Sequence, residues 1–470
     1  MDHSTEAQVF ESAAEKALEQ EDSSFHLSDN EIKDIVEALN AQDTDTVHTA
    51  LDDLSNADTA ELLSKIKPEE REELLNNYHE VLDPLLFTDM DPELRNTTLS
   101  AMPAEQIAEM ISELESDDAL TLIEQLEPEF QQEIIRKLSA HMRLALEEGL
   151  NFPEDSAGRL MRRELVAIPE FWTVGKTLDY LRAATDSLPE DFLDLFIIDP
   201  SYHLKGEIPL NKIVRANRTE KLMDLKLDDV HPIPATMDQE DVSHLFRRED
   251  LVSAPVVDDN NRLIGVITID DVLDVIDEEA QEDILRLAGV DQGDLYRAVW
   301  STTGTRFRWL FVNLLTAVLA SLVISFFDAT IEQIVALAVL MPIVASMGGN
   351  AGMQAMTVAV RAIATHQISS TNTWRVIWKE TLVGTINGSA FAIITGLMAA
   401  AWFHSPILGG VIAAAMIINL FIAGLSGAGI PLLLNKMGSD PAVSSTVLLT
   451  TITDVVGFFA FLGLATLFLI

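Results

Sequence analysis

Residues 309–327 read Trp-Leu-Phe-Val-Asn-Leu-Leu-Thr-Ala-Val-Leu-Ala-Ser-Leu-Val-Ile-Ser-Phe-Phe, a run without a charged side chain. A helix crosses the hydrocarbon core of a bilayer with about 20 such residues. Four more apolar stretches follow, at 331–364, 382–403, 408–434 and 443–470. The stretch 331–364 is too long for one straight crossing, and its Pro342 and Gly348-Gly349 predict a kinked or broken helix. We therefore predict an α-helical transmembrane domain of five spans over 301–470.

Charge is distributed very unevenly along the 470 residues. The chain has 31 Lys and Arg against 75 Asp and Glu, but residues 301–470 contain only six of the bases and five of the acids. The preceding part is a polyanion, which argues against a nucleic-acid partner. The chain has no Cys, which excludes disulfides and thiolate metal sites.

The part before the membrane spans is predicted to contain an acidic disordered tail and an all-α domain. Residues 1–27 lack the basic and apolar regions of a signal peptide, so we expect them to stay in the cytoplasm. In 28–153, helix-start signals such as Pro92-Glu93, Pro103-Ala104-Glu105 and Pro128-Glu129 interrupt short apolar stretches. This pattern predicts stacked short helices in a superhelix, with an ordinary helical bundle as the alternative.

Residues 154–275 alternate between strand and helix patterns, in two copies. The second copy ends in Gly265-Val266-Ile267-Thr268-Ile269-Asp270-Asp271. These copies resemble a tandem pair of CBS domains, which implies an α/β fold. The resemblance implies a nucleotide half-site, for ATP or another adenine nucleotide, at Gly265, Thr268 and Asp271. The corresponding segment of the first copy, 206–212, lacks the Thr and the Asp. The alternative is that both modules only fold and dimerise.

The distribution of bases predicts the orientation in the membrane. Five spans with a cytoplasmic N-terminus place the C-terminus outside. All six bases of 301–470 then lie on the inner side, whereas Asp328 and Glu332 lie outside, as the positive-inside rule requires.

Asp454 lies deep in the last span, within Thr450-Thr451-Ile452-Thr453-Asp454-Val455-Val456-Gly457. A carboxylate at this depth costs at least about 2.5–3.5 kcal/mol on insertion scales and usually serves function. Thr446, Thr450 and Asp454 share one helical face, which makes a stripe of oxygen atoms suited to a hard cation such as Mg²⁺. The alternative is an Asp that is protonated or hydrogen-bonded to a neighbouring helix for packing.

Two other segments carry polar groups. In 341–354, Asn350 and Gln354 form an amide pair on one helical face, although glycines there also suit ordinary helix packing. Residues 276–300 are predicted to form an acidic linking, or plug, helix between the soluble modules and the membrane. Such an acidic run is usually a solvated face, but its position is one where a gate would lie.

The combination of these modules with the elements P…GGNxGxQ and TTxTDxxG resembles an MgtE-type magnesium channel. The resemblance implies a homodimer in the bacterial inner, or plasma, membrane. It also implies a Mg²⁺-selective channel, not an enzyme, which intracellular Mg²⁺ closes by binding to acidic residues. The implied ion pathway consists of Gly349, Asn350, Gln354, Thr450, Thr451, Thr453 and Asp454. The regulatory Mg²⁺ ligands that it implies or makes plausible are Asp117, Asp118, Asp238, Glu240, Asp250, Asp271, Asp274, Glu279, Glu282, Asp283 and Asp440.

Two other functions are open at this point. Asp454 could be the proton or sodium site of a secondary divalent-cation exchanger coupled to an ion gradient. The CBS pair could instead make the chain a membrane-tethered nucleotide sensor. An ATP-driven pump is disfavoured, because the sequence has no G-x-x-x-x-G-K-[ST] phosphate loop.

Overall fold

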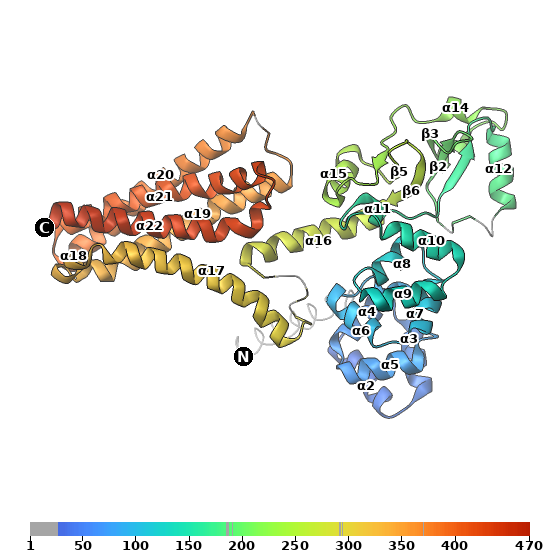
Figure 1. The fold of residues 1–470 in the computed structure, drawn as a ribbon, viewed down its shortest axis with the longest axis horizontal. Helices are drawn as coiled ribbons and strands as arrows, with labels where there is room; N and C mark the ends of the chain where they lie inside the picture. The colour runs from blue at the N-terminus through green and yellow to red at the C-terminus, as the bar shows by residue number, and fades with distance from the viewer. Residues whose placement is uncertain (1–26, 185–187, 190, 291–292, 294, 370) are drawn as a thin grey trace, which may run out of the picture. The chain divides into compact units, whose positions relative to one another are not determined.

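The computed structural model describes residues 27–184, 188–189, 191–290, 293, 295–369 and 371–470 (Figure 1). The tail predicted for 1–27 lies outside these residues, apart from Leu27. The chain divides into two compact units, Met1–Asp277 and Glu278–Ile470.

The first unit begins with short helices, several of which start at a capping side chain or with a proline in the first turn. Ser28 forms a capping box with Glu31, and Pro92 and Pro128 lie in the first turns of their helices. The prediction of an all-α domain is confirmed. Its helices are Asp29–Asn40 (α2), Thr44–Asp53 (α3), Asn56–Lys65 (α4), Pro68–Tyr78 (α5), Pro92–Ser100 (α6), Ala104–Ile111 (α7), Ser116–Ile123 (α8), Pro128–Lys137 (α9) and Ala140–Gly149 (α10), with a 3-10 turn at Pro84–Phe87 (η1).

The two α/β copies have the same topology, as the repeat predicts. In each, a parallel strand pair is followed by an antiparallel partner, in the orders β1-β2-β3 and β4-β5-β6. The elements are Ala157–Leu160 (α11), Val166–Pro169 (β1), Val174–Ala183 (α12), Asp194–Ile198 (β2), Leu204–Pro209 (β3), Leu210–Arg215 (α13), Leu222–Leu225 (α14), Ile233–Pro234 (β4), Gln239–Glu249 (α15), Ser253–Val257 (β5) and Leu263–Thr268 (β6).

A shared apolar core joins the two small sheets. Phe196 and Leu204 of the first copy pack with Val257 and Val266 of the second. Each copy has a further core of its own, between its sheet and its helices. The α/β prediction for this region is confirmed.

The linking helix differs from the expected range of 276–300. Helix α16 spans Ile269–Ala288, so it starts directly after β6 and stops well before 300. It ends in a Schellman motif: Gly289 has φ +71°, its N–H donates to the Arg286 carbonyl at 3.0 Å, and the Val290 N–H donates to the Leu285 carbonyl at 3.1 Å. Glycine adopts this left-handed conformation without steric cost, which is why the helix stops there.

Among its described residues, the second unit contains five helices long and apolar enough to span a membrane, as predicted. In Figure 1 they lie alongside one another, and α21 packs against α19, α20 and α22. Gly384 and Gly424 allow the backbones of α20 and α21 to approach closely. The helices are Val299–Ser325 (α17), Asp328–Gln333 (α18), Ala336–Ala364 (α19), Thr373–Phe403 (α20), Pro406–Lys436 (α21) and Pro441–Leu469 (α22), of which only α18 is short.

The stretch 331–364 is divided, but not where the sequence predicted. Helix α19 runs without interruption through Pro342 and Gly348-Gly349. The division comes earlier, between α18 and α19, at residues 334–335. Pro342 is tolerated in the second turn of α19, because the missing N–H leaves only one carbonyl near the helix start without its usual donor.

Candidate functional site

Asp454 carries the one charge of α22, and its side chain is half-buried. Among the residues that the structure describes, its carboxylate has no hydrogen-bond or ion-pair partner. A carboxylate with four lone-pair sites is therefore available to a ligand.

The threonines around Asp454 use their protons within their own helix. The Thr450 hydroxyl donates to the Thr446 carbonyl at 3.0 Å, and that of Thr451 donates to the Val447 carbonyl at 2.6 Å. Thr453, which is fully buried, donates to the Leu449 carbonyl at 3.1 Å. The hydroxyl oxygens of Thr450 and Thr451, both half-buried, therefore present lone pairs rather than protons.

Asn350 and Gln354 share the exposed side of α19, as their spacing predicts. No hydrogen bond joins these two amides within the described chain. The opposite side of α19 faces α22, since a Cβ on Gly352 would lie 2.7 Å from a methyl carbon of Leu449. Gly349 is half-buried, and a Cβ added to it would have no atom within 4 Å.

Asn419 of α21 holds three membrane helices together and was not identified from the sequence. Its side chain is fully buried, and its Nδ2 donates to the Val344 carbonyl of α19 at 2.8 Å. A Cβ on Gly348 would lie 2.2 Å from Nδ2, and one on Gly457 would lie 2.8 Å from it. Asn419 thus sets the spacing of α19 and α22 one turn away from Asp454. The sequence signal was a lone amide within an apolar span.

The end of α16 docks on the membrane helices of the second unit. The Thr446 hydroxyl of α22 donates to the Leu287 carbonyl at 3.1 Å, and Leu287 packs against Met356 and Leu449. An ion pair of 2.8 Å joins Arg286 to Asp440. Arg286 also pairs with Glu282.

Asp283 lies in this docking region with carboxylates close to it. Burial raises the pKa of Asp283, and the negative charges of Asp440 and Glu279 raise it further. The structure therefore brings together four of the residues predicted to bind regulatory Mg²⁺, namely Glu279, Glu282, Asp283 and Asp440.

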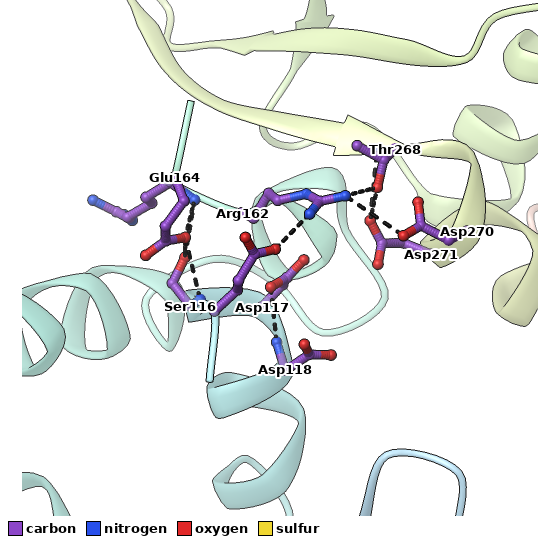
Figure 2. A network of polar contacts seen from close by, with 10 residues as sticks. Ser116, Asp117, Asp118, Arg162, Glu164, Thr268, Asp270 and Asp271 are labelled. Carbon is purple, nitrogen blue, oxygen red and sulfur yellow. Dashed lines mark hydrogen bonds and ion pairs between the residues drawn. The ribbon is translucent and has the colours of Figure 1, made fainter. Parts of the chain in front are cut away.

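A second group of carboxylates surrounds Arg162 in the first unit (Figure 2). Arg162 forms ion pairs with Glu115 and, at 3.6 Å, with Asp270, and it bonds the Thr268 hydroxyl. The Thr268 hydroxyl in turn donates to the Asp271 carboxylate at 2.6 Å. We call Glu115, Asp117, Asp118, Asp270 and Asp271, with Arg162, the Arg162 cluster.

The Arg162 cluster has five carboxyl groups and one guanidinium, and the pKa values of three of its aspartates are raised. Burial, followed by the charge of Asp271, raises the pKa of Asp117 well above its usual value and that of Asp118 to about 7. Burial also raises the pKa of Asp271 to about 6, although its hydrogen bond from Thr268 opposes this. At neutral pH the cluster therefore retains protons that a divalent cation could replace.

The other predicted regulatory residues have different local roles. Asp274 has its pKa raised by burial and by the charge of Asp89, a neighbour that the sequence did not indicate. Asp238 caps α15 by accepting the Glu240 N–H at 2.9 Å. Asp250 ends the same helix with φ +52°.

The predicted nucleotide half-site is occupied by the chain's own groups. The Thr268 hydroxyl accepts a hydrogen bond from Arg162 and donates one to Asp271. Met161 packs close to Gly265, since a Cβ added to Gly265 would lie 2.5 Å from the Met161 sulfur. Arg162 was not identified from the sequence, where nothing distinguishes it from the other basic residues of the acidic soluble part. Over the described ranges, no three His, Cys, Asp or Glu side chains are grouped closely enough to hold a metal ion.

Three family descriptions match successive parts of the chain. "MgtE intracellular N domain" matches residues 54–155, "CBS domain" matches 222–278, and "Divalent cation transporter" matches 341–464. Together they follow the order of domains that the fold shows.

Similar proteins cover nearly the whole chain. A magnesium transporter MgtE of Thermus thermophilus is 32% identical over 443 residues, which is 92% of this chain and 97% of the relative. One of Bacillus subtilis is 28% identical over 431 residues, 85% of this chain and 95% of the relative. A solved cytosolic domain of the Mg²⁺ channel MgtE in complex with ATP is 30% identical, with a TM-score of 0.46, and covers 51% of this chain and 97% of that one. Because identity and coverage extend from the helical domain through the last membrane span, this chain belongs to the MgtE family of magnesium transporters.

Proposed function

We propose that the chain forms a Mg²⁺-selective channel for magnesium uptake, which Mg²⁺ closes from the cytoplasmic side. The observation that carries this proposal is Asp454, a carboxylate in an apolar span that has no partner within the described residues. Placing a carboxylate within the membrane costs free energy, and such residues usually serve function. The curated relatives named magnesium transporters support Mg²⁺ as the cargo.

The chemistry around Asp454 suits a hydrated divalent cation. Mg²⁺ gives up its water reluctantly and prefers oxygen ligands. The carboxylate of Asp454 and the hydroxyl oxygens of Thr450 and Thr451 would accept hydrogen bonds from that hydration shell, and the exposed amides of Asn350 and Gln354 would add to it. A membrane potential of 100 mV would supply about 4.6 kcal/mol per Mg²⁺, so no other energy source is required.

Closing would use the acidic groups outside the membrane. In the second unit, Mg²⁺ between Asp283 and Asp440 would replace repulsion by attraction and hold α16 against the end of α22. In the first unit, Mg²⁺ would replace protons in the Arg162 cluster. Loss of Mg²⁺ from both places would release these contacts and open the pathway.

We propose a homodimer in the bacterial inner membrane, with a cytoplasmic N-terminus and an external C-terminus. The position of every base of 301–470 on the inner side supports this orientation. Helix α17 is mostly exposed along its apolar length, which a bilayer or a second copy would cover. Two copies would also supply additional oxygen ligands to a shared ion.

The test is Mg²⁺ uptake into proteoliposomes that contain the full chain and a Mg²⁺-sensitive dye, under an imposed membrane potential. Asp454→Asn should reduce uptake by at least about tenfold, which corresponds to about 1.4 kcal/mol. Asp328→Asn is the matched control, because Asp328 is an exposed acid outside the stripe. Equal uptake by the Asp454→Asn variant and the control would refute the assignment of Asp454 to the ion pathway.

The same vesicles separate the channel from an exchanger. A channel conducts Mg²⁺ when proton and sodium gradients are absent, whereas a coupled exchanger stops. Flux that disappears when both gradients are removed would favour the exchanger.

A nucleotide at the CBS pair is a further prediction, for which ATP is the probe. Binding at Gly265, Thr268 and Asp271 requires that Arg162 leave the Thr268 hydroxyl. ATP should then bind more weakly to a Thr268→Val variant, which removes the hydroxyl, than to the unmodified chain. Equal binding by that variant would place ATP elsewhere.

A further inference from the structure

A cleft of about 850 Å³ opens between the two α/β copies, and none of the Arg162 cluster residues lines it. It lies between the β3–α13 segment and the β5–α15 segment, and its walls include Leu210, Val214 and Leu251. This volume is typical of sites for small organic molecules.

Glu207 of β3 lines this cleft with a buried carboxyl group that has no partner among the described residues. Glu207 is only 7% exposed, and no described residue forms a hydrogen bond or an ion pair with its carboxyl group. Asp194 of β2, 9% exposed, lines the cleft beside it and accepts a hydrogen bond of 2.6 Å from the Ser253 hydroxyl. A buried carboxyl group without a hydrogen-bond partner is costly whether it is protonated or not, so a ligand with hydrogen-bond donors would account for Glu207.

The strand registers show what stands at these places in the second copy. Asp194 pairs with Pro209 in the first copy, as Ser253 pairs with Thr268 in the second. Glu207, two residues before Pro209, therefore corresponds to Val266. At these three places the first copy has Asp194, Glu207 and Pro209, and the second copy has Ser253, Val266 and Thr268. The first copy therefore has two carboxyl groups that the second lacks, and it lacks the threonine hydroxyl.

The side chains that line the cleft favour a positively charged ligand over a negatively charged one. Proline offers neither a hydroxyl nor an N–H to a sugar or a phosphate. Five carboxylates line the cleft, of Asp194, Glu207, Asp229, Glu249 and Asp250, against the bases Arg215 and His231. A phosphate group would be repelled, whereas a cation would be attracted. Apolar walls favour a cation with a hydrocarbon stem over a bare metal ion, which needs several oxygen ligands close together.

We propose that this cleft binds an aliphatic di- or polyamine, with an ammonium group held between Glu207 and Asp194 and the methylene stem on the apolar walls. The cleft would thus sense an organic cation, separately from the Mg²⁺ sites. Burial, together with the charge of Asp194, raises the pKa of Glu207 to about 8. Binding at pH 7 should therefore release about one proton from Glu207.

The test is isothermal titration of the full chain in detergent with spermidine, at pH 7 and physiological salt, in two buffers of different ionisation enthalpy. We expect a saturable site for one spermidine per chain, with proton release. Glu207→Gln, which keeps the shape of the side chain, should weaken binding at least about tenfold and abolish the proton release. Asp259→Asn, at an exposed acid of the β5–β6 turn outside the cleft, should leave both unchanged.

A second variant tests the location independently of Glu207. Val214→Trp fills the cleft from a position that is 66% exposed, so the fold should tolerate it, and it should abolish spermidine binding. Equal spermidine binding by Glu207→Gln and Asp259→Asn would overturn the proposal. ATP that binds the unmodified chain and not Val214→Trp would also overturn it, because the cleft would then accept an anion. None of these measurements depends on Mg²⁺ flux.

Discussion

Raising the pH from 6 to 8 should strengthen Mg²⁺ binding to the Arg162 cluster, because Mg²⁺ and protons compete for the same carboxylates. Asp118 has its pKa raised to about 7 and Asp271 to about 6, mainly by burial. A group of pKa about 7 is about nine-tenths protonated at pH 6 and about one-tenth at pH 8, which changes the apparent affinity about tenfold. A group of pKa about 6 adds about twofold. The two together predict a change of about twentyfold.

The same pKa shifts fix the sign of the stability effect without Mg²⁺. Both folded-state pKa values lie above the ordinary aspartate value of 3.8. Protonation therefore stabilises the fold, and this contribution is lost as the pH rises from about 4 through about 7. Added Mg²⁺ should restore the lost stability most strongly at the high end of this range.

The assay is isothermal titration of Mg²⁺ into the full chain in detergent at pH 6 and at pH 8. A double variant, Asp118→Asn with Asp271→Asn, should lose most of the twentyfold difference, because two competing protons are gone and that of Asp117 is left. Asp259→Asn, at an exposed acid outside the Arg162 cluster, should retain the full difference. Equal dissociation constants of the unmodified chain at the two pH values, or an undiminished twentyfold difference in the double variant, would refute the reasoning.

Three further predictions concern other parts of the chain. Gly348→Ala should reduce Mg²⁺ uptake severalfold, because its Cβ would lie 2.2 Å from Asn419, whereas Gly410→Ala, with no atom within 4 Å of its Cβ, should have no effect on uptake in the same vesicles. Glu207→Gln should raise the free energy of unfolding by about 1–3 kcal/mol at pH 8.5 and less at pH 5, because the raised pKa of Glu207, about 8 against an ordinary 4.5, makes the unmodified fold lose stability as the pH rises through this range. A thermal melt without added amine measures this, and an equal rise at both pH values would contradict it. Asp283→Asn should weaken inhibition by cytoplasmic Mg²⁺, so the Mg²⁺ concentration that halves the flux should increase, and an unchanged inhibition curve would exclude Asp283 from the gate.

The location of the candidate site was partly accessible from the sequence. Asp454 was identified because a single charge in an apolar span is visible in the chain itself. Asn350 and Gln354 followed from helical spacing, and the structure places both on one exposed face. Asn419 was missed, because a neutral amide has no distinctive signal until its contacts with Gly348 and Gly457 are known.

The acidic regulatory residues were harder to rank. The sequence contains so many carboxylates that composition alone could not distinguish Asp283, which faces Asp440, from Asp238, which caps a helix. The ends of α16 were also misplaced: the helix begins at Ile269, directly after β6, and ends before Gly289, where the backbone turns left-handed.

Hydropathy, charge and repeat pattern by themselves determined the division into helical, CBS and membrane parts, because these signals are local or depend on period along one helix or strand. Tertiary structure alone decided that Arg162 lies among Asp117, Asp118 and Asp271, and that Glu207 is buried without a partner. Both facts depend on segments far apart in the chain that exclude water from the same place. Desolvation, and the pKa shifts that follow from it, is a property of that packing and not of any single stretch of residues.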